Sequence, residues 1–391
     1  MQIIVCNAGS TSLKFKVYIY PEKTILATGR VERVGDPNGS IYSFKDGFGN
    51  EKYDDHAKAG TYKEGIELFL NDIGGADQAD VVAFKAVLAQ EYPGVHEIDE
   101  GVIASMKKGL SIAPVHNSAY LGAIEAFREA APKARLIAAF ETAFHRTIPE
   151  KRYIYGVPYE WYEKYGVRKM GYHGASHSYV AGKLKDYKKV ISCHLGGSSS
   201  LCAISDGKSV NNSFGLSLQV GVTNVSRNGD IDPFILPYLL KEGMAYEEIL
   251  RGLEKTGGLK GVSGLSGDMR DLRKAAGEGN KRARLAIDIF VEGVRNYIGA
   301  YAIQLGGVDA IAFTAGIGEN DAETRKEILS GLSFMGIEMD EEKNKRNESE
   351  ISAEGSKVKI FIIKADEESV VADNAYKLVI DEITDHQQIS G

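Results

Sequence analysis

The chain has 391 residues, of which 43% are hydrophobic and 26% are charged, and its formal net charge at pH 7 is −7. This length exceeds a single ordinary hydrophobic core, so we expect two domains with the composition of a soluble globular protein. The acidic balance argues against a nucleic-acid partner or a membrane surface, which would need a basic face, and no segment approaches the length of a membrane span. An anionic substrate is not excluded, because a few local cations suffice to bind one.

The three cysteines are Cys6, Cys193 and Cys202. They show neither a paired framework nor zinc-type spacing, so we expect them to be reduced and buried. The N-terminus begins directly with a strand pattern, without the basic and apolar segments of a secretory signal. These features predict a cytoplasmic protein.

The N-terminal segment is typical of an antiparallel sheet. Residues 3–8 are largely apolar, residues 9–12 form a Gly/Ser-rich turn, and residues 13–20 alternate between apolar and polar side chains. This period of two indicates a half-buried strand, so the turn closes a hairpin. The tetrapeptide Asp-Pro-Asn-Gly at 36–39 and the dipeptide Asp-Gly at 46–47 mark further turns.

The pattern then changes to helices that alternate with strands. Helical spacing covers residues 62–70 and 119–130, and buried strands are expected at 80–88 and 136–140. The segment 148–158 is rich in Pro and Tyr and has no clear period, and we interpret it as the crossing between two domains.

The second half restarts with a hairpin on the same plan as the first. Residues 190–201 repeat the apolar strand, the Gly/Ser-rich turn and the apolar return. Glycine tolerates the tight backbone of such a turn, and exposed amides and hydroxyls offer an anion several donors. Two copies nearly half a chain apart indicate a duplicated domain that closes on a nucleotide, although a Walker-type P-loop is absent.

A long helix, a short strand and a third Gly-rich turn follow. The apolar residues of the expected helix recur at helical spacing and predict one face packed on the core: Leu285, Ile289, Phe290, Val294, Tyr297, Ile298 and Tyr301. Residues 309–314 predict a buried strand that runs into the turn 315–320, whose amides and following helix would face an anion or a ribose. Ordinary strand-to-helix turn chemistry is the alternative interpretation of that turn.

The C-terminal part contains a charged run and a last helix. We interpret the run 340–350 as a solvated face, and the last helix, about 367–383, carries Val370, Val371, Leu378 and Val379 on its buried side. Strands that alternate with helices place the chain in the α/β class.

Several motifs, in order along the chain, resemble successive motifs of the acetate kinases. They lie at residues 7–14, 113–117, 142–145, 171–177, 193–196, 261–266 and 313–320, and the resemblance continues to Asp366-Glu367-Glu368. It implies a fold of duplicated actin-like ATPase (ribonuclease H-like) domains with a central interdomain cleft. The implied domains are residues 1–147, completed by the C-terminal helix at about 367–391, and residues 148–366.

The resemblance also implies an activity and its groups. The family transfers a phosphoryl group reversibly between ATP and a short carboxylate, uses Mg²⁺, with Mn²⁺ as a substitute, and is usually homodimeric. A carboxylate is already a nucleophile, so this transfer needs positioning and charge neutralisation more than a strong base. The implied metal positions are Asn7 and Glu367. His173 and Arg227 are the implied catalytic groups, with Glu141 orienting the acceptor or the metal.

The remaining implied positions hold the substrates. The acceptor site is implied at Lys85, Val87 and His116. The nucleotide site is implied at Lys14, His194, Leu195, Gly196, Gly197, Ser198, Asp268, Met269, Arg270, Gly316, Ile317, Gly318, Glu319 and Asn320. Lys14 has an alternative role as the outward residue of an alternating strand. His173 and His177 have the spacing of a zinc pair, but Gly174 and the missing metalloprotease Glu argue against zinc.

The chain departs from the family pattern around the acceptor. Where the family has His-Arg-Val-Val-His-Gly-Gly, residues 84–90 are Phe-Lys-Ala-Val-Leu-Ala-Gln, and Lys85 lacks the planar fork of Arg. Glu141 replaces an Asp, Gly197-Ser198 replaces Asn-Gly, and Leu218 replaces a Pro expected to line the acyl pocket. Four outcomes stay open: a working acetate kinase, a kinase for propionate, butyrate or a larger acid, a nucleotide-binding paralogue with little transfer, and a bare ATPase.

Overall fold

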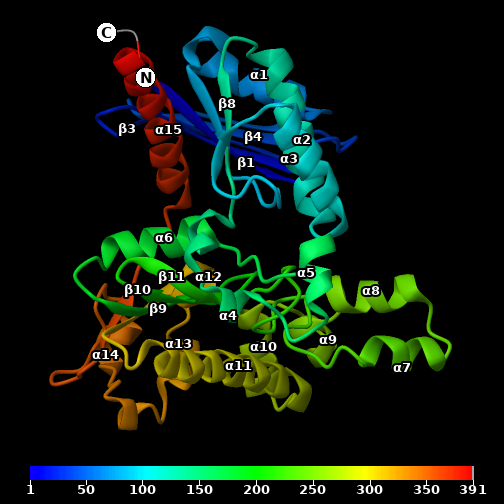
Figure 1. Cartoon of the computed structure of the whole chain (residues 1–391), viewed down its shortest axis with the longest axis vertical. Coiled ribbons are helices and arrows are strands. Elements are labelled where there is room, and N and C mark those ends of the chain that lie inside the picture. The colour runs from blue at the N-terminus through cyan, green and yellow to red at the C-terminus, as the bar shows by residue number, and fades with distance from the viewer. Residues whose placement is uncertain (390–391) are drawn as a thin grey trace. The chain divides into compact units, whose positions relative to one another are not determined.

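The computed structural model describes residues 1–389, with side chains up to residue 383. The chain divides into two compact units, one of residues 1–143 together with the segment from Asp366 onward, the other of residues 144–365 (Figure 1). The C-terminal helix α15 (Glu367–Ile389) therefore belongs to the N-terminal unit, and residues 390–391 of the expected helix lie outside the described residues. Each helix of the described part is too short or too polar to span a lipid bilayer.

The first unit is built on an eight-stranded sheet with the order β5-β4-β3-β2-β1-β6-β8-β7. Its strands are β1 (Gln2–Gly9), β2 (Ser12–Ile19), β3 (Thr24–Glu32), β4 (Ser40–Asp46), β5 (Glu51–Ala57), β6 (Val81–Phe84), β7 (Val95–Glu97) and β8 (Arg135–Ala139). Besides α15, its helices are α1 (Tyr62–Asp72), η1 (Ala76–Gln78), α2 (Glu100–Lys108), η2 (Gly109–Ser111) and α3 (Pro114–Ala130). The short helix η3 (Ala143–Thr147) lies where the units divide.

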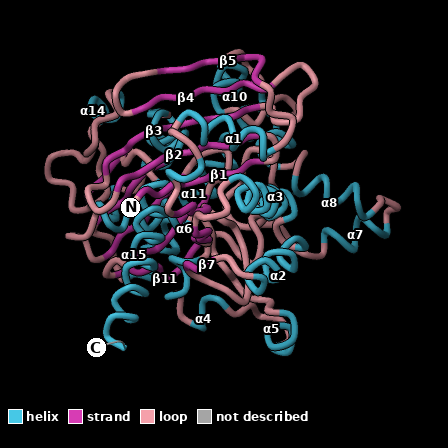
Figure 2. Tube along the Cα trace, turned by 90° about the horizontal axis from the view of Figure 1, so that it is seen from above, coloured by secondary structure: helices cyan, strands magenta, loops and turns pink. Residues whose placement is uncertain are grey.

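The pairing of these strands confirms the predicted hairpin and turns. β1 and β2 are antiparallel, with Gly9 opposite Ser12. The strands β2 to β5 continue the antiparallel order side by side (Figure 2), so the turns at 36–39 and 46–47 join sheet strands as expected. β6 runs parallel to β1, and β8 runs parallel to β6.

Side chains of β2 alternate between the two faces of this sheet. The Phe15 ring stacks on Phe69 of α1 with ring centroids 4.4 Å apart. The next residue points to the opposite face, where Lys16 Nζ lies 3.0 Å from Asp366 Oδ1 at the start of α15. Accordingly α1 and α3 cover one face and α15 covers the other (Figure 1).

The second unit is built on a five-stranded sheet with the order β11-β10-β9-β12-β13. Its strands are β9 (Lys189–His194), β10 (Ser200–Ser205), β11 (Lys208–Asn212), β12 (Ala310–Thr314) and β13 (Lys359–Ile362). Its helices are α4 (Glu150–Tyr153), α5 (Tyr159–Tyr165), α6 (Gly174–Lys183), α7 (Ile235–Lys241), α8 (Tyr246–Glu254), α9 (Gly258–Ser263), α10 (Met269–Gly277), α11 (Lys281–Leu305), α12 (Ala315–Asn320), α13 (Ala322–Leu329), η4 (Ser333–Met335) and α14 (Glu341–Lys345).

The second sheet repeats the topology of the first. β9 and β10 form the second predicted hairpin, with His194 opposite Ser200. β10 and β11 are antiparallel, whereas β12 runs parallel to β9 and β13 parallel to β12. The same sequence of pairings relates β3-β2-β1-β6-β8, so the predicted duplicated α/β fold is confirmed.

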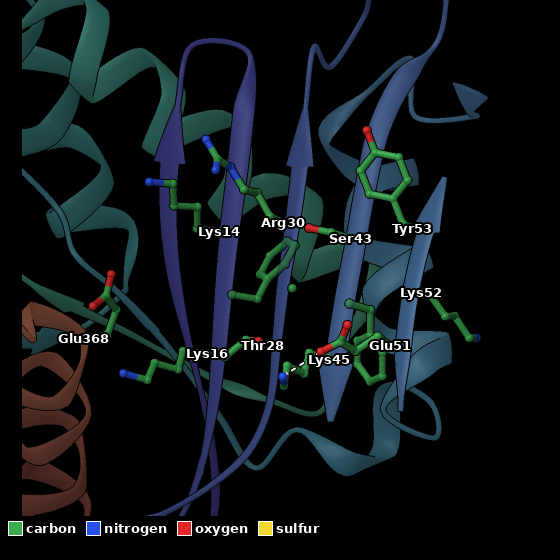
Figure 3. Close-up of a pocket in the computed structure, with 13 residues that line it drawn as sticks. Lys14, Lys16, Thr28, Arg30, Ser43, Lys45, Glu51, Lys52, Tyr53 and Glu368 are labelled. Atoms are coloured by element: carbon green, nitrogen blue, oxygen red, sulfur yellow. Dashed lines mark hydrogen bonds and ion pairs between the residues drawn. The ribbon is translucent and has the colours of Figure 1, made fainter. Parts of the chain in front are cut away.

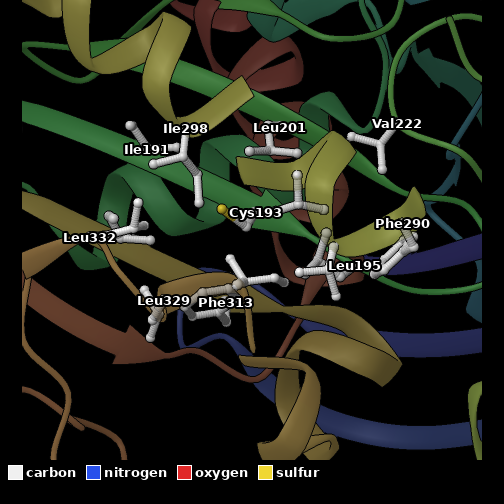
Figure 4. Close-up of a cluster of buried hydrophobic side chains, with 14 of the residues drawn as sticks. Ile191, Cys193, Leu195, Leu201, Val222, Phe290, Ile298, Phe313, Leu329 and Leu332 are labelled. Atoms are coloured by element: carbon white, nitrogen blue, oxygen red, sulfur yellow. The ribbon is translucent and has the colours of Figure 1, made fainter. Parts of the chain in front are cut away.

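One hydrophobic core cluster of the second unit lies between its sheet and α11, and a separate cluster includes residues of α6. In Figure 4, Cys193 of β9 and Phe313 of β12 lie in one cluster of buried side chains with Phe290 and Ile298 of α11. All three cysteines are buried and unpaired, in line with the prediction. Burial raises the pKa of the Cys202 thiol to about 12, so this thiol is protonated near neutral pH.

The predicted long helix is confirmed as α11, and Phe290, Val294, Ile298 and Tyr301 are buried as predicted, but the N-terminal part of the buried face differs from the prediction. Leu285 and Ile289 are 50% and 38% exposed. The stripe that reaches the core instead contains Ala283, Ala286 and Ile287 in its first turns. Ala283, Ala286 and Ile287 are fully buried, so the buried stripe runs through these positions, and Leu285 and Ile289 lie beside it.

Other boundaries also differ from the sequence prediction. The strand expected at 80–88 ends at Phe84, although the following segment stays buried. The segment 148–158 contains α4 and lies inside the second unit. The turn expected at 315–320 is itself the helix α12.

At the C-terminal end, α15 buries only part of the expected side. Val371 and Val379 are buried as predicted, whereas Val370 and Leu378 are only half-buried. Between the two valines, small alanines complete the buried stripe, which lets α15 lie close to the sheet. The run 340–350 contains α14 and is largely exposed, apart from the buried Asn344.

Candidate functional site

Four polar side chains of the first unit converge at one edge of its sheet. Asn7 lies near the end of β1, Lys85 directly follows β6, and Glu141 follows β8. These three strands are parallel, so their carboxyl ends meet at the same edge. Glu367, the first residue of α15, joins them by its ion pair with Lys85.

Backbone and side-chain hydrogen bonds fix this edge. The Lys85 amide donates to the Cys6 carbonyl at 3.3 Å, and the Glu141 amide donates to the Ala86 carbonyl at 2.8 Å. The Tyr120 hydroxyl of α3 donates to Asn7 Oδ1 at 3.0 Å. The segments that follow β6 and β8 are therefore hydrogen-bonded to each other, and the segment after β6 is also bonded to β1.

The Lys85 ammonium lies between two carboxylates. Its Nζ is 3.4 Å from Glu141 Oε1 and also forms an ion pair with Glu367 Oε2. The three side chains are 16%, 6% and 13% exposed. Burial alone would lower the pKa of Lys85, but Glu141 and Glu367 raise it well above its ordinary value, so the ammonium form is favoured.

The other predicted residues of this unit lie at different depths. Val87 is buried in the segment after β6, and His116 is exposed in the first turn of α3. Lys14 points outward from β2, with Lys16, Arg30 and Lys45 on the same face of the sheet. With their neighbours, these cations line a groove of about 630 Å³ (Figure 3).

In the second unit, the half-buried His173 contacts a chain of buried side chains formed by Ser200, His177 and Ser192. Its Nδ1 lies 2.9 Å from Ser200 Oγ, which is also 2.9 Å from His177 Nε2. His177 Nδ1 in turn lies 2.8 Å from Ser192 Oγ. Because one hydroxyl donates only one proton, Ser200 donates to one ring nitrogen and accepts from the other, which links the tautomers of His173 and His177.

The backbone holds His173 in an unusual conformation. His173 is the N-cap residue of α6, and its φ of 58° lies in the left-handed region that a non-glycine residue seldom adopts. The His194 ring lies 4.0 Å from the His173 ring, centroid to centroid, and His194 Nδ1 contacts Ser176 Oγ at 2.8 Å. Strain of this kind is often found at functional positions.

Burial controls the protonation of the histidines behind His173. Burial lowers the pKa of His145 to about 4 and that of His177 well below its ordinary value, so both are neutral near pH 7. Burial likewise lowers the pKa of Arg227, which still carries its charge. The Arg227 Nη1 donates to the Leu218 carbonyl at 3.1 Å, which joins two of the positions singled out in the sequence.

Three segments of the predicted nucleotide site line one cavity of about 720 Å³. They are the hairpin glycines 196–197, residues 268–270 and parts of α12. Gly267 precedes the middle segment, and a Cβ at this position would lie 2.3 Å from Val225 Cγ1, so only glycine fits. A hydrogen bond from Arg270 lowers the pKa of Asp268 to about 2, which keeps that carboxylate ionised.

Much of the backbone in this region is already hydrogen-bonded. The Leu195 side chain is buried, its amide donates to Thr314, and its carbonyl accepts from Ile317 and Gly318. The Ala315 amide donates to Glu319 Oε1 at 2.9 Å. The start of α12 therefore offers an anion fewer amides than the sequence suggests. Met269 packs into the core, so it lines the cavity only in part.

Several site residues were not singled out from the sequence. Tyr120 and Arg273 lie beside predicted residues, but helical spacing alone gave no sign of their direction. Ser176 and Ser200 lie inside motifs that the sequence analysis did recognise, so their hydroxyls were a usable signal. Ser198 Oγ is buried and makes no hydrogen bond with the described residues, which suits a ligand at this turn.

Comparisons with known proteins extend over nearly the whole chain. Residues 2–373 match the sequence pattern of the acetokinase family. An acetate kinase of Treponema denticola is 42% identical over 97% of this chain and 100% of its own length. An acetate kinase structure from Porphyromonas gingivalis matches with a TM-score of 0.85 and 33% identity, over 97% of this chain and 99% of that chain. A propionate kinase structure from Francisella tularensis matches with a TM-score of 0.87 and 34% identity. This match covers 95% of this chain and 98% of that chain. The chain therefore belongs to the acetokinase family.

Proposed function

We propose that the chain transfers the terminal phosphoryl group of ATP to acetate, which gives acetyl phosphate and ADP, and that it also catalyses the reverse reaction. The geometric observation that carries this proposal is the cavity of about 720 Å³ where three glycine-containing segments of the second unit meet. A nucleotide suits this cavity, and the family supplies the carboxylate as the acceptor. The two units correspond, in this proposal, to the two actin-like domains 1–147 with 367–391 and 148–366.

The nucleotide is assigned to the second unit. The hairpin residues His194 to Ser198 would bind its phosphates, and residues 268–270 with 316–320 would bind the nucleoside. Lys14 of the first unit would supply a cation to the phosphates. The buried Ser198 hydroxyl supports the hairpin assignment, because it is a donor that the described residues leave unused.

The residues at the carboxyl edge of the first sheet fit a magnesium ion. Asn7 Oδ1 and the carboxylates of Glu141 and Glu367 are oxygen donors of the kind that Mg²⁺ prefers. Asn7 and Glu367 would hold the ion, and Mn²⁺ would be an acceptable substitute. When bound, the ion would neutralise charge on the nucleotide phosphates.

The residues around the reacting groups position them and neutralise their charge. The acetate carboxylate attacks the phosphorus as it stands, so no residue has to remove a proton from it. Lys85, Val87 and His116 would bind the acceptor, and Glu141 would orient it or the metal. His173 and Arg227 would stabilise charge on the phosphoryl group during transfer.

One observation supports a carboxylic acid other than acetate as the acceptor. Leu218 stands where the family has a proline of the acyl pocket, and it is buried with its carbonyl bound by Arg227. A changed side chain in that pocket would alter the preference between acetate and propionate or butyrate. One methylene changes such discrimination by about 1–3 kcal/mol.

Trapping acyl phosphate with hydroxylamine tests the activity. Purified protein is incubated with Mg-ATP and a series of acids from acetate to larger carboxylates, and free phosphate is followed in parallel. The expected result is hydroxamate with acetate and a smaller yield as the acid lengthens. Phosphate release without any acid would indicate a bare ATPase. ATP binding without hydroxamate would indicate a paralogue that has lost transfer.

The assembly and compartment are proposed from the family resemblance. We propose a homodimer located in the cytoplasm. Size-exclusion chromatography with light scattering measures the assembly, and a mass of one chain across the micromolar range would contradict the dimer.

A further inference from the structure

Lys85 stands in the proposed metal and acceptor region, at a position where the family pattern has an arginine. Its ammonium contacts the carboxylates of both Glu141 and Glu367, and all three side chains are largely buried. Two buried carboxylates so placed repel each other unless a cation lies near them. In this structure Lys85 supplies that cation from within the protein.

A lysine at this position can break and re-form its ion pairs with the two carboxylates. A lysine ammonium is a compact charge on a flexible stem, whereas an arginine guanidinium is a planar fork that forms paired hydrogen bonds. Lysine can therefore leave one carboxylate and reach another group by rotating its side chain.

We propose that Lys85 is an internal counter-ion, which neutralises Glu141 and Glu367 before a divalent cation binds and competes with that cation for Glu367. Binding of the divalent cation releases the ammonium toward the anionic acceptor. This inference deepens the proposed function, since it rests on Glu367 as a metal position. It assigns Lys85 a role that couples metal binding to acceptor binding.

Direct binding of Mn²⁺ tests the competition without any turnover. Free Mn²⁺ is measured by electron paramagnetic resonance in the absence of nucleotide and acetate, for the parent protein and Lys85→Met. Removing a charge at this distance should tighten Mn²⁺ binding by about tenfold or more. Lys45→Met is the matched control, because the Lys45 side chain is exposed, pairs with Glu51 at 2.6 Å and should not change Mn²⁺ binding.

The charge-retaining variant separates the charge of Lys85 from its packing. Lys85→Arg should bind Mn²⁺ no more tightly than the parent, because the guanidinium keeps the charge and its paired hydrogen bonds hold the carboxylates. Equal Mn²⁺ affinity of Lys85→Met and the parent would overturn the proposal. So would a tightening in Lys85→Arg as large as that in Lys85→Met, since charge would then not be the cause.

A second pair of variants keeps the test decisive if Lys85→Met does not fold. Lys85→Met combined with Glu141→Gln removes one positive and one negative charge, so the site keeps its charge balance. It should bind Mn²⁺ more tightly than Glu141→Gln alone, and equal affinity would overturn the proposal. Because no substrate is present, these results are independent of the hydroxamate assay, and failure of either proposal can be recognised separately.

Discussion

Replacing Ser200 with alanine tests how the His173 ring is held. Ser200 is fully buried, and its Oγ lies 2.9 Å from both His173 Nδ1 and His177 Nε2. The change removes two hydrogen bonds and leaves buried ring nitrogens without this partner. A buried hydrogen bond contributes about 1 kcal/mol and an unsatisfied buried group costs about 1–3 kcal/mol, so the free energy of unfolding should fall by about 2–4 kcal/mol.

The loss of activity should exceed what lower stability explains. Without Ser200, the His173 ring loses the hydroxyl that links its tautomer to that of His177, so in the proposed function its orientation toward the phosphoryl group is less well defined. A misplaced catalytic group costs about tenfold to hundredfold in kcat. Turnover is measured by hydroxamate formation at a temperature where urea unfolding shows that both proteins are folded. The KM for ATP should change little.

Ser192→Ala is the matched control for this experiment. Its Oγ contacts His177 Nδ1 at 2.8 Å, on the side of that ring away from Ser200. The variant should lose about 1–2 kcal/mol of stability and keep nearly parental turnover. Parental kcat in Ser200→Ala, or an equal fall in both variants, would refute the reasoning that Ser200 positions His173.

Three further predictions concern charge, pH and packing. Arg227→Ala should lower kcat by about a hundredfold or more with little change in ATP affinity by calorimetry, and equal losses would show that its role is misassigned. The pKa of buried His145 is lowered from 6.5 to about 4, and that of His177 is also lowered, so the unfolded chain binds more protons in this range. The free energy of unfolding should therefore fall as pH decreases from 6.5 toward 4, by about 3 kcal/mol from His145 alone. A flat profile in urea unfolding would contradict this. Gly29→Ala would place a Cβ 2.3 Å from Phe69 Cδ2, so it should cost about 1–3 kcal/mol, and an unchanged melting temperature would count against it.

Local patterns were enough to predict the elements that begin each unit. In both hairpins a Gly/Ser-rich turn separates two apolar strands, and the register pairs Gly9 with Ser12 and His194 with Ser200. Alternation along β2 also predicted its faces, because Phe15 packs on α1 while Lys16 points to the other side. Such patterns act within a few residues, so the sequence carries them directly.

Longer-range packing decided the faces and ends of several elements. Leu285 and Ile289 are as apolar as their buried neighbours, yet small alanines of α11 lie nearer the core. The segment after Phe84 stays buried without strand pairing. The Lys85 amide donates to the Cys6 carbonyl, and the carbonyls of Ala86 and Leu88 accept from the Glu141 amide and the Asn117 side chain. A hydropathy pattern records which residues prefer burial but not which of them the neighbouring elements leave room for.

The sequence by itself determined the α/β class, the duplicated hairpins and the family, because these follow from short-range turn chemistry and from motifs in a fixed order. Only the tertiary structure decided that Lys85 lies between Glu141 and Glu367 and that Ser200 joins His173 to His177. These residues come from separate strands and helices, so their meeting depends on sheet order and on the start of α15. The charges and hydrogen bonds that they share exist only once those elements have packed.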